Sequence, residues 1–338
     1  MQLYRQLRDD IVSGTLPAGA KLPSKRFLAR ELEISVITVE HAFGLLLDEG
    51  YAVSRERSGL YSAFGGGAHQ TAKRAAVEDM SVSAETPPKD FPFSVWAKTM
   101  RRVLAEQGER LLVKSPGCGC PELREAIARY LARSRGVVVN PGQIVVGSGS
   151  EYLYSMAAQL LGRDGTFALE DPSYEKIRQV YGANGVSCVY LPMAEDGIDS
   201  DALSACTASV LHVTPYHSYP SGITATAARR HEYASWAQSR NGYIVEDDYD
   251  SEFAASSRRV DTIFSLAPER VIYMNTFTKT LAPSMRMGYM VLPEALMEEY
   301  RRKLGFYSCT VPLFEQLVLA EFINNGDFER YINRRKKS

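Results

Sequence analysis

One lysine lies in a polar stretch that directly follows a run of apolar residues. Residues 271–274 are apolar and predict a buried strand. The stretch 275–289 after it contains Lys279 between hydroxyl side chains, with Arg286 seven positions further on. A partly desolvated lysine amine condenses with carbonyl compounds to a Schiff base, and hydroxyl and guanidinium groups beside it would bind a phosphate. The stretch therefore predicts an anion pocket around an amine, with a surface lysine in a polar loop as the alternative.

Small residues follow another predicted strand. Ser148, Gly149 and Ser150 stand between the mostly apolar residues 143–146 and a predicted helix at 152–161. Small residues at the N-terminus of a helix let backbone N–H groups approach a phosphate, and serine adds a hydroxyl. The same letters also occur in ordinary loops, so this segment is a candidate phosphate site only in combination with others.

An aromatic ring and a carboxylate also occur at predicted strand ends. Tyr174 comes shortly after the mostly apolar residues 166–169, and Asp247 directly follows the predicted strand 243–246, whose first three residues are apolar. Asp247 precedes Lys279 by 32 residues, and a carboxylate at that place would keep a pyridine nitrogen protonated. The alternative for the acidic residues is a solvated run or a metal site.

The elements that must position these residues form an alternating pattern. Helical segments such as 227–238 separate apolar runs that have the length of strands. Apolar strands alternating with helices indicate a mostly parallel sheet that helices cover on both faces, with ligands bound beyond the strand ends. The seven predicted strands are 143–146, 166–169, 186–191, 209–213, 243–246, 271–274 and 287–292.

The first 64 residues have a different pattern of three short helices and a hairpin. Ser24 is expected to cap the second helix, which would direct Phe27, Leu28 and Leu32 inward. The third helix is expected at 36–49, because apolar residues recur there at helical spacing before a glycine. The expected core face of this helix is Val39, Ala42, Phe43 and Leu46, and the expected strands are 51–53 and 60–63. This order predicts a winged helix-turn-helix domain, mainly α with a β wing.

A winged helix-turn-helix places the start of its third helix in the major groove of DNA. Residues 1–64 contain as many Lys and Arg as Asp and Glu, and the formal net charge of the whole chain is −1, so DNA binding would need a local basic patch. A small helical interaction domain is the alternative. The residues expected to face base edges or phosphates are Ser35, Thr38 and His41, and those expected to hold the DNA backbone are Lys25, Arg26, Arg55 and Arg57.

Composition sets the remaining expectations. Residues 65–90 begin with three glycines and are poor in large apolar side chains, so they predict a flexible linker between domains at 1–64 and 91–338. The five cysteines are odd in number and mostly scattered, which suits reduced thiols in the cytoplasm, and the pattern predicts no metal site. The N-terminal residues show no signal-peptide core and no apolar run is long enough to cross a membrane, so we expect a cytoplasmic protein.

The head of the chain resembles the GntR family of bacterial regulators. The resemblance lies in Leu22-Pro23-Ser24-x-Arg26 and in Ser35-x-x-Thr38-Val39, with Glu49-Gly50-Tyr51 after the third helix. Many members carry arginine directly after the serine of the turn, whereas this chain has Val36. The difference removes one expected phosphate or base contact and leaves more of the binding to Arg26 and the wing.

From residue 91 onward the chain resembles the fold-type-I aminotransferases, and the pairing with the GntR-like head resembles the MocR family of transcription regulators. The resemblance implies an α/β, pyridoxal 5'-phosphate (PLP)-dependent transferase-like domain and makes Lys279 the lysine of the internal aldimine. It also implies that Asp247 is the partner of the pyridine nitrogen, that Tyr249 is near the ring hydroxyl and that Tyr174 stacks on the ring. The implied phosphate-binding residues are Ser148, Gly149, Ser150, Thr276 and Arg286.

The chain departs from the aminotransferase pattern in two places. Tyr219 stands where these enzymes usually have an asparagine that hydrogen-bonds the cofactor, which argues against efficient transamination. Fold-type-I proteins also have a smaller C-terminal domain with an arginine for the substrate carboxylate, and this chain ends within the helix that is expected to lead there. We therefore expect a truncated or naturally shortened product.

Three functions fit these residues. The first is a cytoplasmic, sequence-specific transcription regulator that binds promoter or operator DNA and senses a small amino compound through the Lys279 aldimine. The second is an active PLP-dependent aminotransferase with an attached DNA-binding domain, and the third is a fragment that only binds DNA. Fold-type-I sites are commonly built at a dimer interface, so the resemblance also implies a homodimer.

Overall fold

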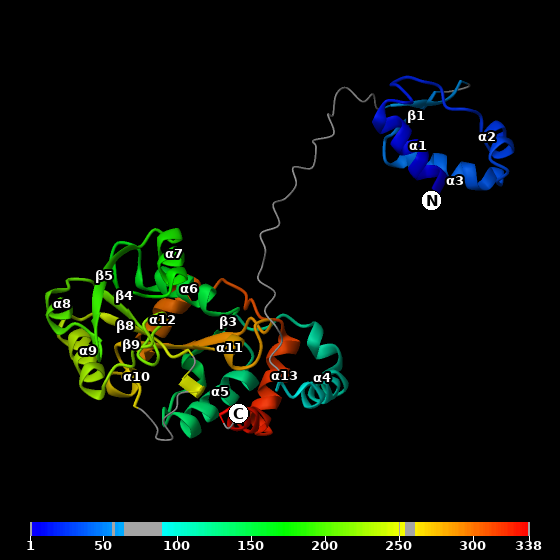
Figure 1. The fold of residues 1–338 in the computed structure, drawn as a ribbon. Helices are drawn as coiled ribbons and strands as arrows, with labels where there is room; N and C mark the ends of the chain where they lie inside the picture. The colour runs from blue at the N-terminus through cyan, green and yellow to red at the C-terminus, as the bar shows by residue number, and fades with distance from the viewer. Residues whose placement is uncertain (1, 56–57, 64–89, 250, 254–260, 337–338) are drawn as a thin grey trace. The chain divides into compact units, whose positions relative to one another are not determined.

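The computed structural model describes residues 2–55, 58–63, 90–249, 251–253 and 261–336 (Figure 1). The chain divides into two compact units, Met1–Ala84 and Glu85–Ser338. We call the described residues 2–63 the head and the described residues from 90 onward the large unit. Arg57 and nearly all of the predicted linker at 65–90 lie outside the described residues. No helix in the described part of the chain is long and apolar enough to span a membrane.

The head contains three helices and a two-stranded antiparallel hairpin, as predicted. The helices α2 and α3 each begin with a serine cap, because the side chains of Ser24 and Ser35 accept hydrogen bonds from the backbone N–H groups of Phe27 and Thr38. The elements are α1 (Gln2–Ser13), α2 (Lys25–Glu31), α3 (Val36–Asp48), β1 (Ala52–Arg55) and β2 (Gly59–Ser62).

The core of the head confirms one prediction and overturns another. The predicted core face of α3 is buried, with Leu46 and Val39 fully inaccessible to solvent. Phe27 and Leu32, however, are 48% and 47% exposed, so the prediction that both point inward is wrong. The helix α2 has only seven residues and buries Leu28; Phe27 precedes Leu28 by one position, about 100° around the helix, and Leu32 lies after the last helical residue.

The large unit is built on an eight-stranded sheet in the order β3-β10-β9-β8-β7-β4-β5-β6. All seven predicted strands are present, and the eighth, β6, has two residues, too few for a periodic signal. Neighbouring strands are parallel except around β10 and β6. The strands are β3 (Ile144–Gly147), β4 (Thr166–Asp171), β5 (Ser187–Ala194), β6 (Gly197–Ile198), β7 (Val210–Val213), β8 (Tyr243–Asp247), β9 (Val271–Thr276) and β10 (Gly288–Val291).

Helices cover both faces of this sheet and enclose two hydrophobic cores. Successive strand residues alternate between the faces, so Val145 packs in the core with α6, α7 and α12, and Val146 packs in the core with α5, α9 and α13 (Figure 1). The helices are α4 (Phe93–Gln107), α5 (Pro121–Ser134), α6 (Ser150–Leu161), α7 (Glu175–Ala183), α8 (Ser200–Ala205), α9 (Ala227–Ser239), α10 (Ile263–Leu266), α11 (Phe277–Thr280), α12 (Glu294–Leu304), α13 (Leu313–Asn324) and α14 (Asp327–Arg335), with short 3-10 turns at Gly108–Leu112, Pro141–Gln143 and Ser251–Phe253.

Candidate functional site

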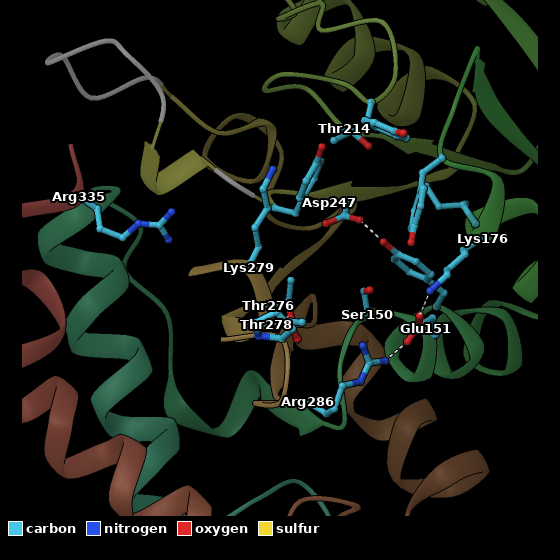
Figure 2. A pocket seen from close by; sticks show the side chains of 16 residues that line it. Ser150, Glu151, Lys176, Thr214, Asp247, Thr276, Thr278, Lys279, Arg286 and Arg335 are labelled. Atoms are coloured by element: carbon cyan, nitrogen blue, oxygen red, sulfur yellow. Dashed lines mark hydrogen bonds and ion pairs between the residues drawn. The ribbon is translucent and has the colours of Figure 1, made fainter. Parts of the chain in front are cut away.

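A cavity of about 800 Å³ lies at the edge of the sheet where the parallel strands end (Figure 2). The strands β3, β4, β7, β8 and β9 all reach this edge with their carboxyl ends, and β10 begins there because it runs the opposite way. Side chains that follow five strands and precede a sixth therefore converge. The lining residues are Ser150, Glu151, Tyr154, Tyr174, Lys176, Ile177, Thr214, Tyr219, Asp247, Tyr249, Thr276, Thr278, Lys279, Pro283, Arg286 and Arg335.

The cavity brings together most of the residues predicted from the sequence. Seven of the nine predicted cofactor-binding residues line it: Ser150, Tyr174, Asp247, Tyr249, Thr276, Lys279 and Arg286. Ser148 does not; its backbone N–H donates to the Thr310 hydroxyl at 3.1 Å. Gly149 is not in the lining either, although it borders Arg286.

The predicted amine lies on the short helix α11, which begins where β9 ends. Lys279 Nζ is 4.7 Å from the centre of the Tyr249 ring. The Thr276 hydroxyl oxygen accepts from the N–H of Thr278 at 3.2 Å, and the Thr278 hydroxyl donates to the carbonyl of Met285 at 3.1 Å. These bonds tie α11 to the loop before β10, so the two threonines hold the turn that presents the lysine.

The opposite end of the cavity suits an anion. The helix α6 begins directly after Gly149, whose φ of +93° favours glycine, and no side chain caps this helix N-terminus. A Cβ atom at Gly149 would lie 3.2 Å from Arg286 Nη2, so the glycine leaves room for the guanidinium. Backbone N–H groups at a helix start and an adjacent arginine together favour phosphate.

Two cations at this end share one carboxylate. Glu151 accepts from Arg286 and, at 3.0 Å, from Lys176 (Figure 2). Partial burial raises the pKa of Glu151, but the hydrogen bonds from Lys176 and Arg286 outweigh it and hold this pKa below its ordinary value. The carboxylate is therefore ionised at neutral pH, and it leaves one net positive charge among the three side chains.

Adjacent aspartates face opposite sides of the sheet. Asp247, the last residue of β8, faces the cavity and accepts a hydrogen bond from the Tyr154 hydroxyl. Burial raises the pKa of Asp247 to about 6, and the bond from Tyr154 limits the rise. Asp248 points away from the cavity and forms a 2.6 Å ion pair with Arg135, which directly follows the helix α5. The structure thus places one of two adjacent carboxylates at the cavity and the other in an ion pair.

Two buried residues behind Asp247 were missed by the sequence analysis. His212 Nε2 lies 4.0 Å from Asp247 Oδ2 and has no hydrogen-bond partner among the described residues, while its Nδ1 shares a 2.7 Å hydrogen bond with the Tyr181 hydroxyl. Burial lowers the pKa of His212 to about 3, so its ring is neutral. His212 lies inside a predicted strand, and Tyr181 lies on α7, which was not predicted. A polar or aromatic side chain at such positions resembles ordinary core, and no sequence signal marked either residue.

The predicted stacking ring lies beside a second tyrosine. Tyr174 and Tyr219 meet edge to face with ring centres 6.0 Å apart, and Tyr219 is 58% exposed. Glu170, at the end of β4, accepts from the Thr214 N–H at 3.2 Å and from the Ser218 hydroxyl at 2.7 Å, and thereby holds the loop that carries Tyr219. Burial raises the pKa of Glu170 to about 8.

An arginine from the end of the chain was also missed. Arg335, on α14, lines the cavity and stacks on the ring of Phe253 at 4.6 Å. It lies beyond Lys279 as seen from Arg286, so positive charge borders the cavity at both ends (Figure 2). Its only sequence signal was a basic run, which usually indicates a solvated surface.

The described DNA-binding candidates lie at the surface of the head, Lys25 being half-buried and the others exposed. Lys25 forms an ion pair with Glu40, and Arg55 packs over the Tyr61 ring at 4.4 Å on the wing. Ser35, which caps α3, shares a 2.8 Å hydrogen bond between its hydroxyl and that of Thr38. Arg26 and His41 are exposed, and Arg57 lies outside the described residues.

Groups of three or more His, Cys, Asp or Glu able to hold a metal ion are absent from the described residues.

Comparison with known proteins divides the chain in the same way. Residues 79–337 match the model of the family "Aminotransferase class I and II", and residues 1–61 match that of "Bacterial regulatory proteins, gntR family". The HTH-type transcriptional regulator YdeL of Bacillus subtilis, described as uncharacterized, is 36% identical over 99% of this chain and 75% of its own. The probable rhizopine catabolism regulatory protein MocR of Rhizobium meliloti is 32% identical over 99% of this chain and 74% of its own.

A solved aminotransferase resembles the large unit. The α-aminoadipate aminotransferase LysN of Thermus thermophilus, crystallised with N-(5'-phosphopyridoxyl)-L-leucine, is 28% identical with a TM-score of 0.66. The match covers 74% of this chain and 65% of the LysN chain. The chain therefore spans about two thirds of the length of this enzyme and about three quarters of the two regulators.

Proposed function

The chain belongs to the MocR-type transcription regulators, in which a gntR-family domain precedes an aminotransferase class I and II domain, and we propose that it regulates transcription in response to an amino compound bound in the large unit. The observation that carries this proposal is the convergence of Lys279, Asp247 and Arg286 on one cavity. DNA binding follows from the family, whereas the sensing role and its residues are the proposal.

Pyridoxal 5'-phosphate is the cofactor of this fold, and the cavity fits its parts. The uncapped N-terminus of α6 and Arg286 suit the phosphate, the buried Asp247 suits a protonated ring nitrogen, and Lys279 suits the carbonyl. The aromatic ring of Tyr174 suits a planar ligand. When bound, the cofactor supplies an electrophilic carbon that exchanges one amine for another.

The residues of the chain then have separate tasks. Tyr154 holds the Asp247 carboxylate by a hydrogen bond and thereby fixes the side of the cavity on which a cationic ring nitrogen is stabilised. Tyr249 lies against the Lys279 side chain and orients its amine. Glu151 keeps Arg286 and Lys176 paired until an anion arrives, so neither cation is left without a counter-charge.

The second cationic border supports an effector that carries an acidic group. Arg335 lies on the Lys279 side of the cavity, whereas Arg286 lies at the anion end that we assign to the cofactor phosphate (Figure 2). An amine that reaches Lys279 with a carboxylate attached could therefore bind Arg335 through charge-assisted hydrogen bonds.

We also propose that the chain acts as a homodimer, which sedimentation equilibrium would test.

The test uses the full chain with pyridoxal 5'-phosphate and two matched amines, L-alanine and ethylamine, which differ by a carboxylate. The wild type should acquire a visible absorbance band that Lys279→Ala lacks, and L-alanine should change both the band and the affinity for a DNA duplex selected from a random library. Ethylamine should act more weakly. If neither the cofactor nor either amine changes the DNA affinity, the sensing role is rejected.

An active aminotransferase is the second candidate, because the same cavity residues serve transamination and LysN is similar. Sustained formation of pyruvate from L-alanine with 2-oxoglutarate would establish it. The exposed Tyr219, at the position where aminotransferases usually have asparagine, favours sensing over turnover.

A further inference from the structure

The start of the helix α3 exposes large aliphatic side chains. Ile37 is 77% exposed and Val36 is 42% exposed, and the half-exposed Phe27 lies on the preceding helix α2. Among the described residues of the head, Ile37 is the most exposed large apolar side chain. Four other apolar residues of α3 fill the core, so the fold does not need these side chains at the surface. Two adjacent exposed aliphatic side chains at a helix start form a candidate contact surface.

The polar side chains of the same helix start are largely engaged within the protein. The Ser35 hydroxyl oxygen accepts from the N–H of Thr38, and the Ser35 and Thr38 hydroxyls bond each other at 2.8 Å. Glu40 is paired with Lys25. Residues 36–41 are Val, Ile, Thr, Val, Glu and His, so they contain no Arg, Lys, Asn or Gln, the residues that make bidentate contacts with guanine or adenine.

The surroundings of the apolar pair favour DNA over a protein partner. Arg26 and Arg55 are exposed on the head, and the N-terminus of α3 adds the positive end of a helix dipole. In a helix-turn-helix the first residues of this helix contact base edges. The major groove presents one apolar group, the C5-methyl of thymine, so an aliphatic residue there reads thymine.

We infer that Val36 and Ile37 form a thymine-reading surface, and that this regulator recognises its DNA site chiefly through methyl contacts at the start of α3. The inference rests on the DNA binding of the head and does not depend on the cofactor or on any amine. It also explains how the chain functions without an arginine at position 36. Specificity comes from shape and methyl groups, while Arg26 and Arg55 supply the phosphate contacts.

The test removes only the methyl groups. Duplexes are first selected from a random library with the full chain, and each thymine of the selected site is then replaced, one at a time, by deoxyuridine. At one or two positions the affinity of the wild type should fall about three- to tenfold, as expected for a buried methyl contact. Binding is measured by fluorescence anisotropy at one fixed salt concentration.

Variants assign the effect to the helix. Ile37→Ala should bind the thymine site more weakly and should no longer distinguish thymine from deoxyuridine at the position read by residue 37. Ile37→Val should retain most of the discrimination, because it keeps a branched aliphatic side chain. Val138→Ala is the matched control, since Val138 is 86% exposed on the large unit and should leave every affinity unchanged.

Three outcomes would overturn the inference. DNA binding that no deoxyuridine substitution weakens would reject methyl reading while leaving the regulator assignment intact. If Val36→Ala and Ile37→Ala both still distinguish thymine from deoxyuridine, other residues contact the methyl group. A change in sedimentation rather than in DNA affinity for Ile37→Ala would identify the surface as a protein contact, and failure to select any sequence would remove the DNA-binding role as well.

Discussion

The head and the large unit hold their functional residues under opposite conditions. In the head these side chains lie at the surface, around a core of eleven mostly aliphatic residues. In the large unit Asp247 and Asp248 are both buried, and burial raises the pKa values of both. Two pairs of adjacent residues illustrate the difference. In the head, Leu46 is fully buried and Leu47 is 37% exposed, whereas in the large unit both Asp247 and Asp248 are buried.

This contrast determines how function and stability are related. In the head the buried core residues are separate from the exposed residues predicted to contact DNA, except for Ser35, which also caps α3. Most substitutions there should therefore affect one property alone. In the large unit a carboxylate that faces the cavity is buried next to one that supports the fold, so burial alone does not separate the two roles.

The largest effect should come from Asp248→Asn. It leaves the Arg135 guanidinium buried without its carboxylate, and we expect a loss of about 3–5 kcal/mol from the free energy of unfolding of the large unit. Asp247→Asn should cost less than about 1 kcal/mol, because burial already disfavours the charge and Tyr154 can still donate to the amide oxygen. Urea unfolding of the cofactor-free protein measures both.

The two variants should rank in the opposite order when cofactor binding is measured. Asp247→Asn should weaken the binding of pyridoxal 5'-phosphate about 10- to 100-fold, as expected for loss of a hydrogen bond to a charged group. Equal stability losses in the two variants would contradict the assignment of Asp247 to the ligand and Asp248 to the fold.

In the head, Leu46→Ala should cost about 2–5 kcal/mol, because it opens a cavity in the core of a domain small enough to be marginal. Leu47→Ala, its neighbour, should change stability by about 0.5 kcal/mol or less. Calorimetry should show that only the transition of the head moves. If Leu46→Ala also abolished the cofactor absorbance, the two units would not be independent.

The pH dependence should also distinguish the units. Burial raises the pKa values of Glu170 and Glu246 to about 8, above the ordinary value of 4.5. A carboxyl group with a raised folded pKa binds its proton more tightly when folded, so its stabilisation is complete below about pH 4.5 and is lost as the pH rises towards 8.

The large unit should therefore unfold more easily at pH 8 than at pH 6, by at most about 1.4 kcal/mol per pH unit for each such group. Glu170→Gln should flatten this dependence, and the head should show none of it. Thermal unfolding at a series of pH values measures the effect, and a large unit most stable at pH 8 would refute the raised pKa values.

The smallest effect should come from Arg26→Ala. Loss of one phosphate contact should weaken DNA binding several-fold and reduce the slope of log K against log salt by about 0.9. Arg101→Ala, an exposed arginine of the large unit, is the control. An unchanged slope for Arg26→Ala would remove this residue from the DNA interface.

Much of the fold was predictable because its signals are local. Seven apolar strands and the buried face of α3 are visible as periodic patterns, and Ser24 and Ser35 mark helix starts. Phe27 and Leu32 were misjudged because a seven-residue helix offers too few positions to define its buried face. The strand β6 was missed because two residues carry no period.

For this protein, the sequence alone determined which residue types follow the strands, because an apolar run and the residues after it lie within a few positions of each other in the chain. Lys279, Asp247 and Gly149 could be named in this way. Only the tertiary structure decided which of them meet. The antiparallel direction of β10 brings Arg286 beside Gly149, the pleat separates Asp247 from Asp248, and α14 brings Arg335 to the cavity. These contacts join positions far apart in the chain, and no local pattern records them.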